Sequence, residues 1–430
     1  MNNELWSSSQ SSPAALPLDE QRAAVRAMLA RCGHPLRRAL IVPPDITRSN
    51  SGAGVLTRLI VEELGFPASG VHVDILPALG THFPMTDAER QEMFGDLPAE
   101  LFKVHNWRSG LMHLGEVPAE FIRAVSQGKL EYAINVEIDE LLVRGEYDAI
   151  FSVGQVVPHE VAGMANGSKN ILVGTGGRDT INKTHFLGAV CNMETILGRA
   201  DNPVRQVFDY ADERCLQRFP LVYVQTVVAN DADGAPVVQG LFIGTGGAPF
   251  SEAAKLCQRL NITMLDAPVK KAVVYLHPKE FKSTWLGNKS VYRTRMAMAD
   301  DGELIVLAPG VETFGEDREI DRLIRKFGYR GTPATLQAVN DHEELRANLS
   351  AAAHLIHGSS EGRFSITYAP GRLTRDEVEG VNFAYGDLAA LQKRYNPATL
   401  ADGWNDVAGE RVFFIRNPAL GLWALRAQFA

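Results

Sequence analysis

Short apolar runs alternate with amphipathic stretches along most of the chain, and many of the apolar runs end at Gly or Pro. A brief uninterrupted apolar run is typical of a buried strand, whereas apolar positions at helical spacing predict a helix. The strands that we predict are 39–43, 70–76, 149–153, 170–174, 221–228, 237–243, 271–276, 303–308, 364–368 and 411–415. The predicted helices are 54–64, 118–127, 250–260, 317–327 and 341–356.

This alternation predicts an α/β fold with mainly parallel sheets. The 430 residues exceed what one ordinary core holds, so we predict two α/β domains with an active-site cleft between them. The stretch 261–270 contains a proline and separates a predicted helix from a fresh strand, which marks the boundary. We divide the chain into a polar, partly disordered lead-in (1–20), an N-terminal domain (21–265) and a C-terminal domain (266–430).

Charge and composition narrow the function classes. The net charge is -8 and no Lys/Arg-rich run occurs, which argues against a nucleic-acid partner. The cysteines are far apart and form no CxxC pair, so we expect reduced thiols: Cys32, Cys191, Cys215 and Cys257. The first residues lack the basic and apolar regions of a signal peptide, and no apolar run reaches the roughly 20 residues of a membrane span. We expect a cytoplasmic protein without a membrane partner.

Two polar clusters follow predicted strands of the N-terminal domain. In the first, Asp45 and Arg48 are three residues apart, so the acid would cap a helix and the guanidinium would hold an anionic substrate. In the second, Thr86 and Glu89 form a capping box, which predicts a helix after Thr86 with His82 in the loop before it. A helix cap beside a solvated Arg, and a histidine without chemistry, are the plain structural alternatives.

A third cluster is denser than the other two. His159, Lys169 and His185 lie close together in the sequence, around the glycine-rich stretch Gly174-Thr175-Gly176-Gly177. Glycines let backbone N–H groups approach a phosphate, although glycine-rich turns are common. Two histidines and a lysine around such a turn are harder to explain by packing alone. This combination favours a functional site.

The order of these clusters resembles that of the nickel-pincer nucleotide-dependent lactate racemase family. Members of that family carry a DxTR segment, a GTH segment, a PHxxAG segment, a Gly-flanked lysine and a following histidine, in this order. The matching segments here are Asp45–Arg48, Gly80–His82, Pro158–Gly163, Lys169 and His185. The resemblance covers about residues 40–188, and it is specific because several segments recur in one order.

The resemblance implies a cofactor, the nickel-pincer nucleotide (pyridinium-3,5-bisthiocarboxylic acid mononucleotide nickel), attached covalently to Lys169 as a thioamide. His185 would be the protein's nickel ligand, which completes a square-planar site with two sulfurs and a ring carbon. Asp45 would support the cofactor or Arg48. The glycine turn would contact the cofactor through Gly174, Gly176 and Gly177. Such a protein depends on cofactor-biosynthesis proteins.

The same resemblance implies an isomerase, a racemase or epimerase that inverts the carbinol carbon of a 2-hydroxy acid by proton-coupled hydride transfer. His82 and His159 would be the opposed acid and base, since inversion needs two groups with pKa values near working pH. Arg48 would hold the substrate carboxylate. Hydride acceptance is the cofactor's chemistry, whereas the protein positions the substrate and excludes water.

The C-terminal domain departs from the lactate-specific pattern. Lactate racemases carry a Tyr-Gln segment followed shortly by a lysine, whereas here Arg293 follows Tyr292, and Met296 stands where the lysine would be. Lys289, Arg293 or Arg295 would then take the cationic role in binding the substrate. Further polar reach comes from His277, Lys279 and Trp285. This favours a small-molecule substrate longer than lactate, a sugar acid such as gluconate. The alternative substrate is a short-chain 2-hydroxy acid such as lactate. The plain structural alternative for the Lys and Arg residues is a solvated helix face.

Function classes of other kinds fit the sequence less well. A zinc-dependent hydrolase would use His82, His159 and His185, but these lack a compact HxH or HExxH spacing. A non-catalytic binding protein is disfavoured because every side chain proposed for catalysis is present. A nicotinamide-dependent dehydrogenase is disfavoured because no GxGxxG follows the first predicted strand.

Overall fold

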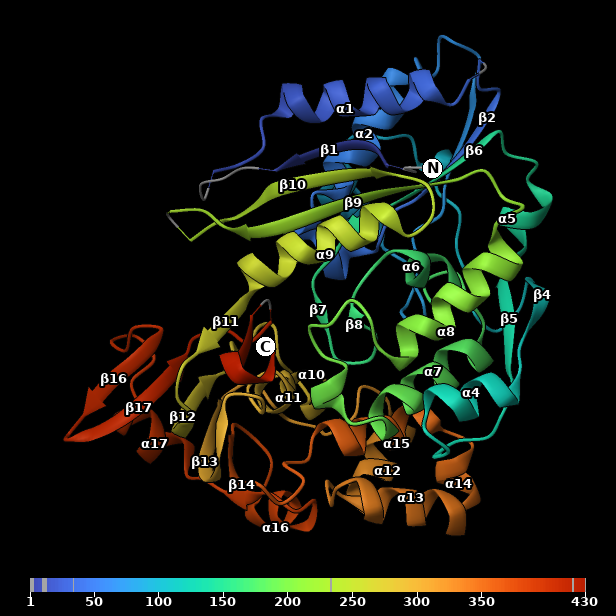
Figure 1. Cartoon of the computed structure of the whole chain (residues 1–430). Coiled ribbons are helices and arrows are strands. Elements are labelled where there is room, and N and C mark those ends of the chain that lie inside the picture. The colour runs from blue at the N-terminus through green and yellow to red at the C-terminus, as the bar shows by residue number, and fades with distance from the viewer. Residues whose placement is uncertain (1–3, 10–13, 34, 233, 420, 430) are drawn as a thin grey trace. The chain divides into compact units, whose positions relative to one another are not determined.

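In the computed structural model the chain forms two compact units, each built on one six-stranded sheet (Figure 1). The structure describes residues 4–9, 14–33, 35–232, 234–419 and 421–429. The first unit comprises Met1–Thr184 and Gly198–Leu260, and the second comprises His185–Leu197 and Asn261–Ala430. The mainly parallel α/β fold predicted from the alternation of strands and helices is confirmed.

The sheet of the first unit has the strand order β1-β10-β9-β6-β2-β3. Neighbouring strands are parallel from β3 to β9 and antiparallel from β9 to β1. These strands are β1 (Glu4–Ser9), β2 (Arg38–Val42), β3 (His72–Ile75), β6 (Ala149–Gln155), β9 (Leu221–Asn230) and β10 (Pro236–Gly244). All but β1 lie within a few residues of a predicted strand.

Helices cover both faces of this sheet (Figure 1). On one face, α1 (Leu18–Arg31) and α2 (Ala53–Glu63) bury Met28 and Ile60 against the strands. On the other, α9 (Ala248–Asn261) brings Leu256 so close to Gly240 of β10 that a Cβ there would overlap it. The remaining elements of the first unit are α3 (Asp87–Phe94), β4 (Leu111–Val117), α4 (Ala119–Val125), β5 (Ile134–Asp139), α5 (Glu140–Arg144), β7 (Pro158–His159), β8 (Gly163–Met164), α6 (Ser168–Leu172), the first half of α7 (Arg178–Val190) and α8 (Pro203–Ala211), with 3-10 turns Ile46–Ser51 and Ala99–Leu101 and a π-helical turn Asp212–Leu216. The 3-10 turn Met193–Thr195 belongs to the second unit.

The polar N-terminal segment differs from the prediction. Residues 4–9 form β1, which pairs antiparallel with β10 at the edge of the sheet. The rest of the predicted lead-in that the structure describes already belongs to the approach to α1, which begins at Leu18. Edge pairing uses backbone N–H and C=O groups, so a strand there needs no continuous apolar run. This is why the composition of the segment did not indicate a strand.

The predicted strand 170–174 is wrong, because this apolar stretch lies on the short helix α6 and the turn after it. Asn166 and Gly167 have φ of 66° and 64°, which turns the chain sharply before Ser168. The Asn170 side chain then donates to Val42 O and Ser152 Oγ, both at 3.0 Å. The helix is thereby fastened across β2 and β6, so its apolar residues are buried without forming a strand.

The sheet of the second unit has the order β15-β14-β13-β12-β17-β16, and only the β16–β17 pair is antiparallel. One face is covered by α17 (Leu388–Arg394), which packs on a core that includes Val273, Ile305 and Phe414. The strands are β12 (Val269–Tyr275), β13 (Met298–Ala308), β14 (Phe364–Pro370), β15 (Ala384–Tyr385), β16 (Gly403–Val407) and β17 (Glu410–Ile415), with a separate parallel pair β11 (Ile262–Leu265) and β18 (Leu422–Leu425).

The helices of the second unit correct one prediction. The expected single helix 341–356 is broken into α14 (Glu343–Arg346) and α15 (Leu349–His357), because Asn348 caps the second by accepting from Ala351 N–H. The other helices are α10 (Thr284–Gly287), α11 (Lys289–Tyr292), α12 (Arg318–Phe327), α13 (Thr332–Asp341) and α16 (Arg375–Gly380), followed by a final 3-10 turn Arg426–Gln428.

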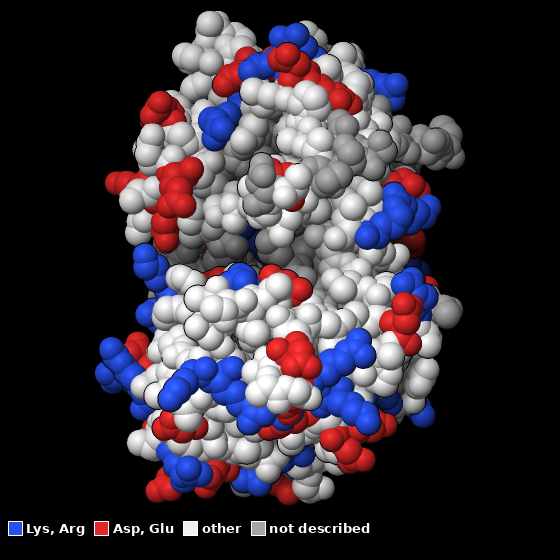
Figure 2. Space-filling view, turned by 90° about the vertical axis from the view of Figure 1, so that its left-hand side faces the viewer, with Lys and Arg blue, Asp and Glu red and all other residues white. Residues whose placement is uncertain are grey.

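The surface shows no large region of one charge on the face in Figure 2, where acidic and basic side chains are interspersed. Within the residues that the structure describes, no helix has both the length and the apolar character needed to cross a bilayer.

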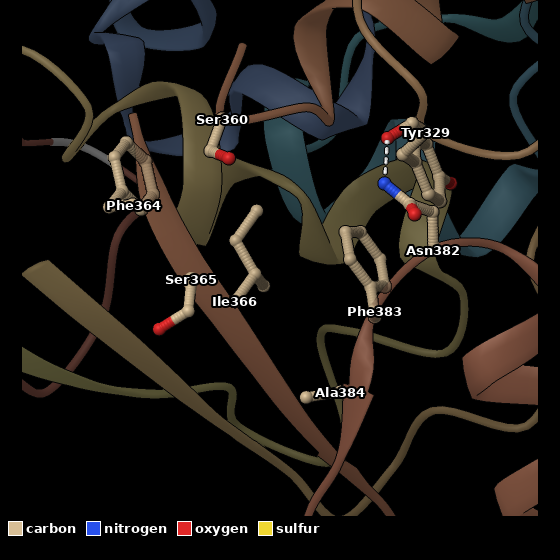
Figure 3. Close-up of a pocket in the computed structure, with 8 residues that line it drawn as sticks. All are labelled: Tyr329, Ser360, Phe364, Ser365, Ile366, Asn382, Phe383 and Ala384. Carbon is tan, nitrogen blue, oxygen red and sulfur yellow. Dashed lines mark hydrogen bonds between the residues drawn. The ribbon is translucent and has the colours of Figure 1, made fainter. Parts of the chain in front are cut away.

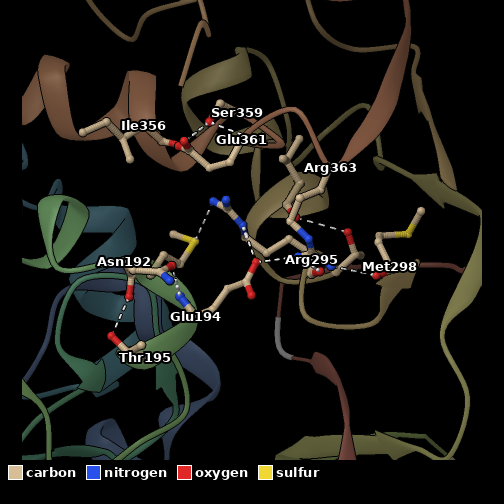
Figure 4. Close-up of polar contacts among 12 residues, drawn as sticks. Asn192, Glu194, Thr195, Arg295, Met298, Ile356, Ser359, Glu361 and Arg363 are labelled. Carbon is tan, nitrogen blue, oxygen red and sulfur yellow. Dashed lines mark hydrogen bonds and ion pairs between the residues drawn. The ribbon is translucent and has the colours of Figure 1, made fainter. Parts of the chain in front are cut away.

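A short segment from the first half of the sequence, His185–Leu197, belongs to the second unit. Glu194 in this segment holds two guanidinium groups of that unit (Figure 4). Its Oε1 lies 2.6 Å from Arg363 Nη1 and 3.4 Å from Nε of Arg295, a side chain that is only 2% exposed. Arg363 also pairs with Asp300 at 2.8 Å. The segment is therefore tied to the second unit by a charge network that includes the buried guanidinium of Arg295.

We predict that Glu194→Ala destabilises the protein by about 2–4 kcal/mol, because the buried Arg295 guanidinium loses a close carboxylate. Urea unfolding measures this change. Glu312→Ala is the matched control, since its pair with Arg372 is solvent-exposed and should contribute less than about 1 kcal/mol. Equal effects of the two substitutions would contradict the importance of this charge network.

Candidate active site

Polar side chains follow three adjacent parallel strands of the first unit. Asp45 comes after β2, His82 after β3 and His159 after β6, and these strands are neighbours in the order β6-β2-β3. The carboxyl ends of parallel strands meet at one edge of a sheet, which is where ligands of α/β proteins bind. The three clusters recognised in the sequence therefore arise from one edge of one sheet.

Asp45 and His82 form a hydrogen-bonded pair. Asp45 caps the 3-10 turn after β2, where it accepts from Thr47, and its Oδ2 lies 2.7 Å from Nδ1 of His82. Burial raises the pKa of Asp45, but the hydrogen bonds from His82 and Thr47 outweigh it and hold this pKa below its ordinary value. An ionised Asp45 accepts the Nδ1 proton of His82. The lone pair of the neutral ring is then on Nε2.

The loop that carries His82 is fixed at both ends. Gly80 N–H donates to Gly174 O at 2.8 Å, and Thr86 and Glu89 form the predicted capping box at the start of α3. The prediction of a helix after Thr86 with His82 before it is confirmed. About half of the His82 side chain is exposed, so the ring is accessible as well as oriented.

His159 has the opposite hydrogen-bonding arrangement. It lies on β7 and is 9% exposed, and its Nδ1 accepts from the backbone N–H groups of Val161 at 3.1 Å and Ala162 at 3.4 Å. A neutral ring that accepts at Nδ1 carries its proton on Nε2. His82 and His159 are thus held in different tautomers by their surroundings.

Lys169 lies in the first turn of α6 and is partly buried. Burial lowers the pKa of Lys169 to about 8, and the positive charges of Arg48 and Arg205 add to this effect while Glu160 opposes it. Among the described residues, no side-chain hydrogen bond to Lys169 contributes to this lowering of its pKa. A lysine in such surroundings presents a larger neutral fraction near physiological pH than an ordinary lysine does, and the neutral form of an amine is the nucleophilic one.

Arg205 is a site residue that the sequence reasoning missed. It is 2% exposed, stacks on the Phe250 ring with 3.9 Å between guanidinium carbon and ring centroid, and donates to Met164 O and Asn166 O. Burial lowers the pKa of Arg205 to about 10. The detectable signal was an arginine on the apolar face of a helix beside Phe208. Its bonds hold the backbone just before Lys169.

The glycine turn after α6 is tightly packed. A Cβ at Gly176 would overlap the carbonyl oxygen of Leu172, and one at Gly177 would meet the Glu137 carboxylate at 2.5 Å. The N–H groups of Gly174 and Gly176 donate to Lys169 O and Val173 O. These two N–H groups thus continue the hydrogen bonding of α6, and the direct contact of the glycines with a cofactor stays a prediction.

The residues around Lys169 fit an anionic nucleotide bound through a lysine. Arg48 and Arg205 place positive charge near the amine, and the amide of Asn166 is buried with no hydrogen-bond partner for either its N or its O among the described residues. A buried amide without partners is costly unless a ligand or water satisfies it. His185, the predicted nickel ligand, is half-buried on the part of α7 that belongs to the second unit.

No group of three or more His, Cys, Asp or Glu side chains with metal-ligand geometry occurs in the described parts of the chain. A zinc site of the type considered from the sequence would need such a group. The nickel-pincer nucleotide differs in this respect, because the resemblance assigns it only one protein ligand.

The predicted substrate-binding residues of the second unit differ from one another in burial and in their contacts within the protein. Arg293 is 3% exposed and donates to Gly421 O at 2.9 Å, while Arg295 is held in the Glu194 network. Both guanidinium groups therefore have structural contacts that the sequence did not reveal. Lys289 is only partly buried, with its ammonium 5.9 Å from the Phe281 ring centroid, and Tyr292 is buried.

A polar aromatic cluster near these residues was also missed. His354 contacts the Trp285 ring at 4.4 Å between centroids, and its Nε2 lies 3.1 Å from the hydroxyl of Tyr329. That hydroxyl also contacts Thr284 Oγ1 at 2.8 Å. The available signal was His354 and His357 at helical spacing in the otherwise apolar α15.

A pocket of about 250 Å³ also lies in the second unit (Figure 3). Tyr329, Phe383 and Phe364 line it together with two serines, and Asn382 donates to Tyr329 O at 3.1 Å. None of the site residues predicted from the sequence lines this pocket.

We predict that Lys169→Met stabilises the protein without cofactor by about 2–3 kcal/mol at pH 7. Folding lowers the pKa of Lys169 to about 8, so the ammonium opposes folding below that pH. This penalty disappears as the pH rises through the ordinary lysine pKa of about 10.5. Thermal unfolding at pH 7 and pH 10 measures the difference, and a gain that does not shrink at the higher pH would contradict the explanation.

Comparisons with known proteins show a related sequence segment and a shared fold. Residues 21–196 match the sequence model described as the lactate racemase N-terminal domain. A search of the curated proteins gave no match.

Two solved structures share the fold over almost the whole chain. A crystal structure of a protein from Thermotoga maritima superposes with a TM-score of 0.79 at 22% identity, covering 96% of this chain and 99% of that one. The lactate racemase apoprotein from Thermoanaerobacterium thermosaccharolyticum superposes with a TM-score of 0.71 at 17% identity, covering 97% and 94%. At these identities the likeness shows the fold. The match over residues 21–196 shows in addition that this part of the chain is similar to the lactate racemase N-terminal domain.

Proposed function

We propose that the protein is a racemase or epimerase that inverts the carbinol carbon of a 2-hydroxy acid and carries a nickel-pincer nucleotide on Lys169. The observation that carries the proposal is the Lys169 amine, whose pKa of about 8 and cationic surroundings suit covalent attachment of an anionic cofactor. His185 would be the nickel ligand. When bound, the group supplies the hydride acceptor and donor that protein side chains lack.

The Asp45–His82 pair suits proton transfer at the substrate hydroxyl. Nε2 of His82 accepts the hydroxyl proton, and the ionised Asp45 stabilises the imidazolium that results. The pair also fixes which nitrogen faces the substrate. Asp45 would thereby act on His82, a role that differs from the support of the cofactor or of Arg48 expected from the sequence.

His159 supplies the second proton-transfer group. Its Nε2 carries the proton of the neutral ring, because Nδ1 accepts backbone N–H groups. Inversion requires groups on both faces of one carbon, and two histidines in different tautomers supply one proton acceptor and one donor. Arg48 would hold the substrate carboxylate through charge-assisted hydrogen bonds.

We propose a polyhydroxy acid such as gluconate as the substrate, with lactate as the alternative. Arg293 and Arg295 also have contacts within the protein, with Gly421 O and Glu194, so they are not reserved for the substrate. Lys289 and the Trp285–His354 cluster support the proposal instead, because an aromatic face beside polar groups suits a chain of hydroxyl-bearing carbons.

The test is to express the chain together with cofactor-making proteins and to offer single stereoisomers of lactate and gluconate. We expect a mass adduct on Lys169 and inversion at C2, about tenfold or more efficient with gluconate, since an unsatisfied buried donor costs about 1–3 kcal/mol. Equal or better turnover of lactate would favour the short-chain alternative. Protein that carries the adduct but inverts neither acid would refute the function.

The roles of Lys169 and His185 separate in the same preparation. Lys169→Ala should abolish the adduct and turnover together, whereas His185→Ala should lower nickel content first. His82→Ala and His159→Ala should keep nickel and lose about a hundredfold in rate. Loss of nickel from the His82 variant, with nickel retained in the His185 variant, would reverse the assignment.

We predict that Asp45→Asn lowers kcat by about 10- to 100-fold with little change in the folded state. The amide oxygen still accepts from His82 Nδ1, but the imidazolium loses its counter-charge, so the acidic limb of the pH–rate profile should move to lower pH. Asp87→Asn is the control, because that carboxylate is exposed at the start of α3. An unchanged profile in the Asp45 variant would exclude electrostatic support of His82.

A further inference from the structure

The turn after Lys169 is held by three hydrogen bonds from three separate parts of the first unit. Gly174 O accepts from Gly80 N–H at 2.8 Å, and Thr175 O accepts from Asp139 N–H at 2.8 Å. Gly176 O lies 3.1 Å from Nε2 of His105. Successive carbonyl oxygens are thus bound by the His82 loop, by the junction of β5 and α5, and by a histidine side chain.

His105 is buried, with 3% of its surface exposed, and both of its ring nitrogens face oxygen atoms. Nδ1 lies 2.8 Å from Oδ2 of Asp139, while the other oxygen of that carboxylate caps α5 by accepting from Leu141 N–H. Carbonyl and carboxylate oxygens only accept, so both contacts are hydrogen bonds when the ring carries a proton on each nitrogen. A lone pair facing either oxygen would leave a buried polar contact unsatisfied.

The backbone of Lys169 is part of the same network. Lys169 O accepts from Val173 N–H at 2.9 Å and Gly174 N–H at 3.2 Å, so the turn is bonded directly to the residue that bears the amine. Gly80 lies two residues before His82, and its bond to Gly174 connects the turn to the loop of the proposed base. A movement of the turn would therefore displace both groups.

We propose that His105, paired with Asp139, is a positioning residue that locks the Gly174–Gly177 turn and thereby sets the placement of Lys169 relative to the His82 loop. Its importance for turnover rests on the function proposed for Lys169 and His82, whereas the hydrogen bonds of His105 are independent of that function. His105 would act without touching substrate or cofactor, through the backbone that carries the reacting groups.

The hydrogen bonds can be tested in the full chain without cofactor, by NMR of protein labelled with 15N in its histidines. We expect a proton on Nε2 of His105, the nitrogen that faces Gly176 O, with slow exchange because the ring is buried. Assignment uses the signal lost in His105→Gln. An Nε2 without a proton would overturn the proposal, because Gly176 O would then have no donor.

The positioning role is tested by the reactivity of Lys169 in the same protein. An amine-selective acylating reagent is applied from about pH 6.5 to pH 10, and modification at Lys169 is followed by peptide mass spectrometry. The unmodified protein should show a midpoint near pH 8. In His105→Phe, which keeps the volume but removes both donors, water should enter and raise the midpoint by about one unit, slowing modification at pH 8 about fivefold.

Two further variants separate positioning from general damage. His105→Gln keeps a donor for Gly176 O and should show most of the pH dependence of Lys169 modification seen in the unmodified protein. If His105→Phe does not fold, the profile of His105→Gln decides whether His105 positions Lys169. His113→Phe is the control, because His113 is exposed on β4 and should leave the profile unchanged. An original profile in folded His105→Phe would overturn the positioning role. An ordinary lysine profile in the unmodified protein would instead count against the anchoring function of Lys169, while the NMR result still decides the His105 hydrogen bonds.

Discussion

The burial of the Lys169 amine beside Arg48 and Arg205 is the constraint on which the rest of the first unit depends. A partly buried ammonium next to two guanidinium groups is unfavourable, and Glu160 offsets this only in part. The three cationic side chains stay together because hydrogen bonds that involve neutral backbone carbonyls fix the chain around Lys169. Arg205 donates to the neutral carbonyl groups of Met164 and Asn166. A carbonyl does not neutralise the guanidinium as a bonded carboxylate would, so the positive charge of Arg205 acts on the Lys169 amine.

How far the sequence predicts the site depends on whether a residue acts locally or through the tertiary fold. The capping box of Thr86 and Glu89 is local, and it correctly placed His82 in a loop before a helix. The strands of both sheets, apart from β1, β15 and β16, were predictable from their apolar runs. The short helix α6 was not, since an apolar run of this length is compatible with strand or helix until the contacts of Asn170 decide.

Side chains that act at long range had no sequence signal of comparable strength. His105 contacts Gly176, which is 71 positions away in the chain, and nothing in its neighbourhood marks it as buried. Arg293 and Arg295 show the converse case, in which the contacts within the protein could not be read from the sequence. Their charge and spacing suggested substrate contacts, which stay a prediction, and the fold adds contacts of Arg293 with Gly421 and of Arg295 with Glu194. A charged residue in the sequence is a candidate for ligand binding, but only the folded structure shows which parts of the protein the side chain contacts.

The segment His185–Leu197 has a consequence for how the chain can be divided. A fragment that ends near residue 260, where the first unit ends, would contain this segment without Arg295 and Arg363, which bind its Glu194. The segment also carries buried apolar side chains, among them Leu187, Met193 and Leu197, which such a fragment would have to keep covered. The N-terminal domain recognised by sequence, residues 21–196, is therefore not a self-contained folding unit, and a truncated form made for study would need either the second unit or a redesigned 185–197 segment.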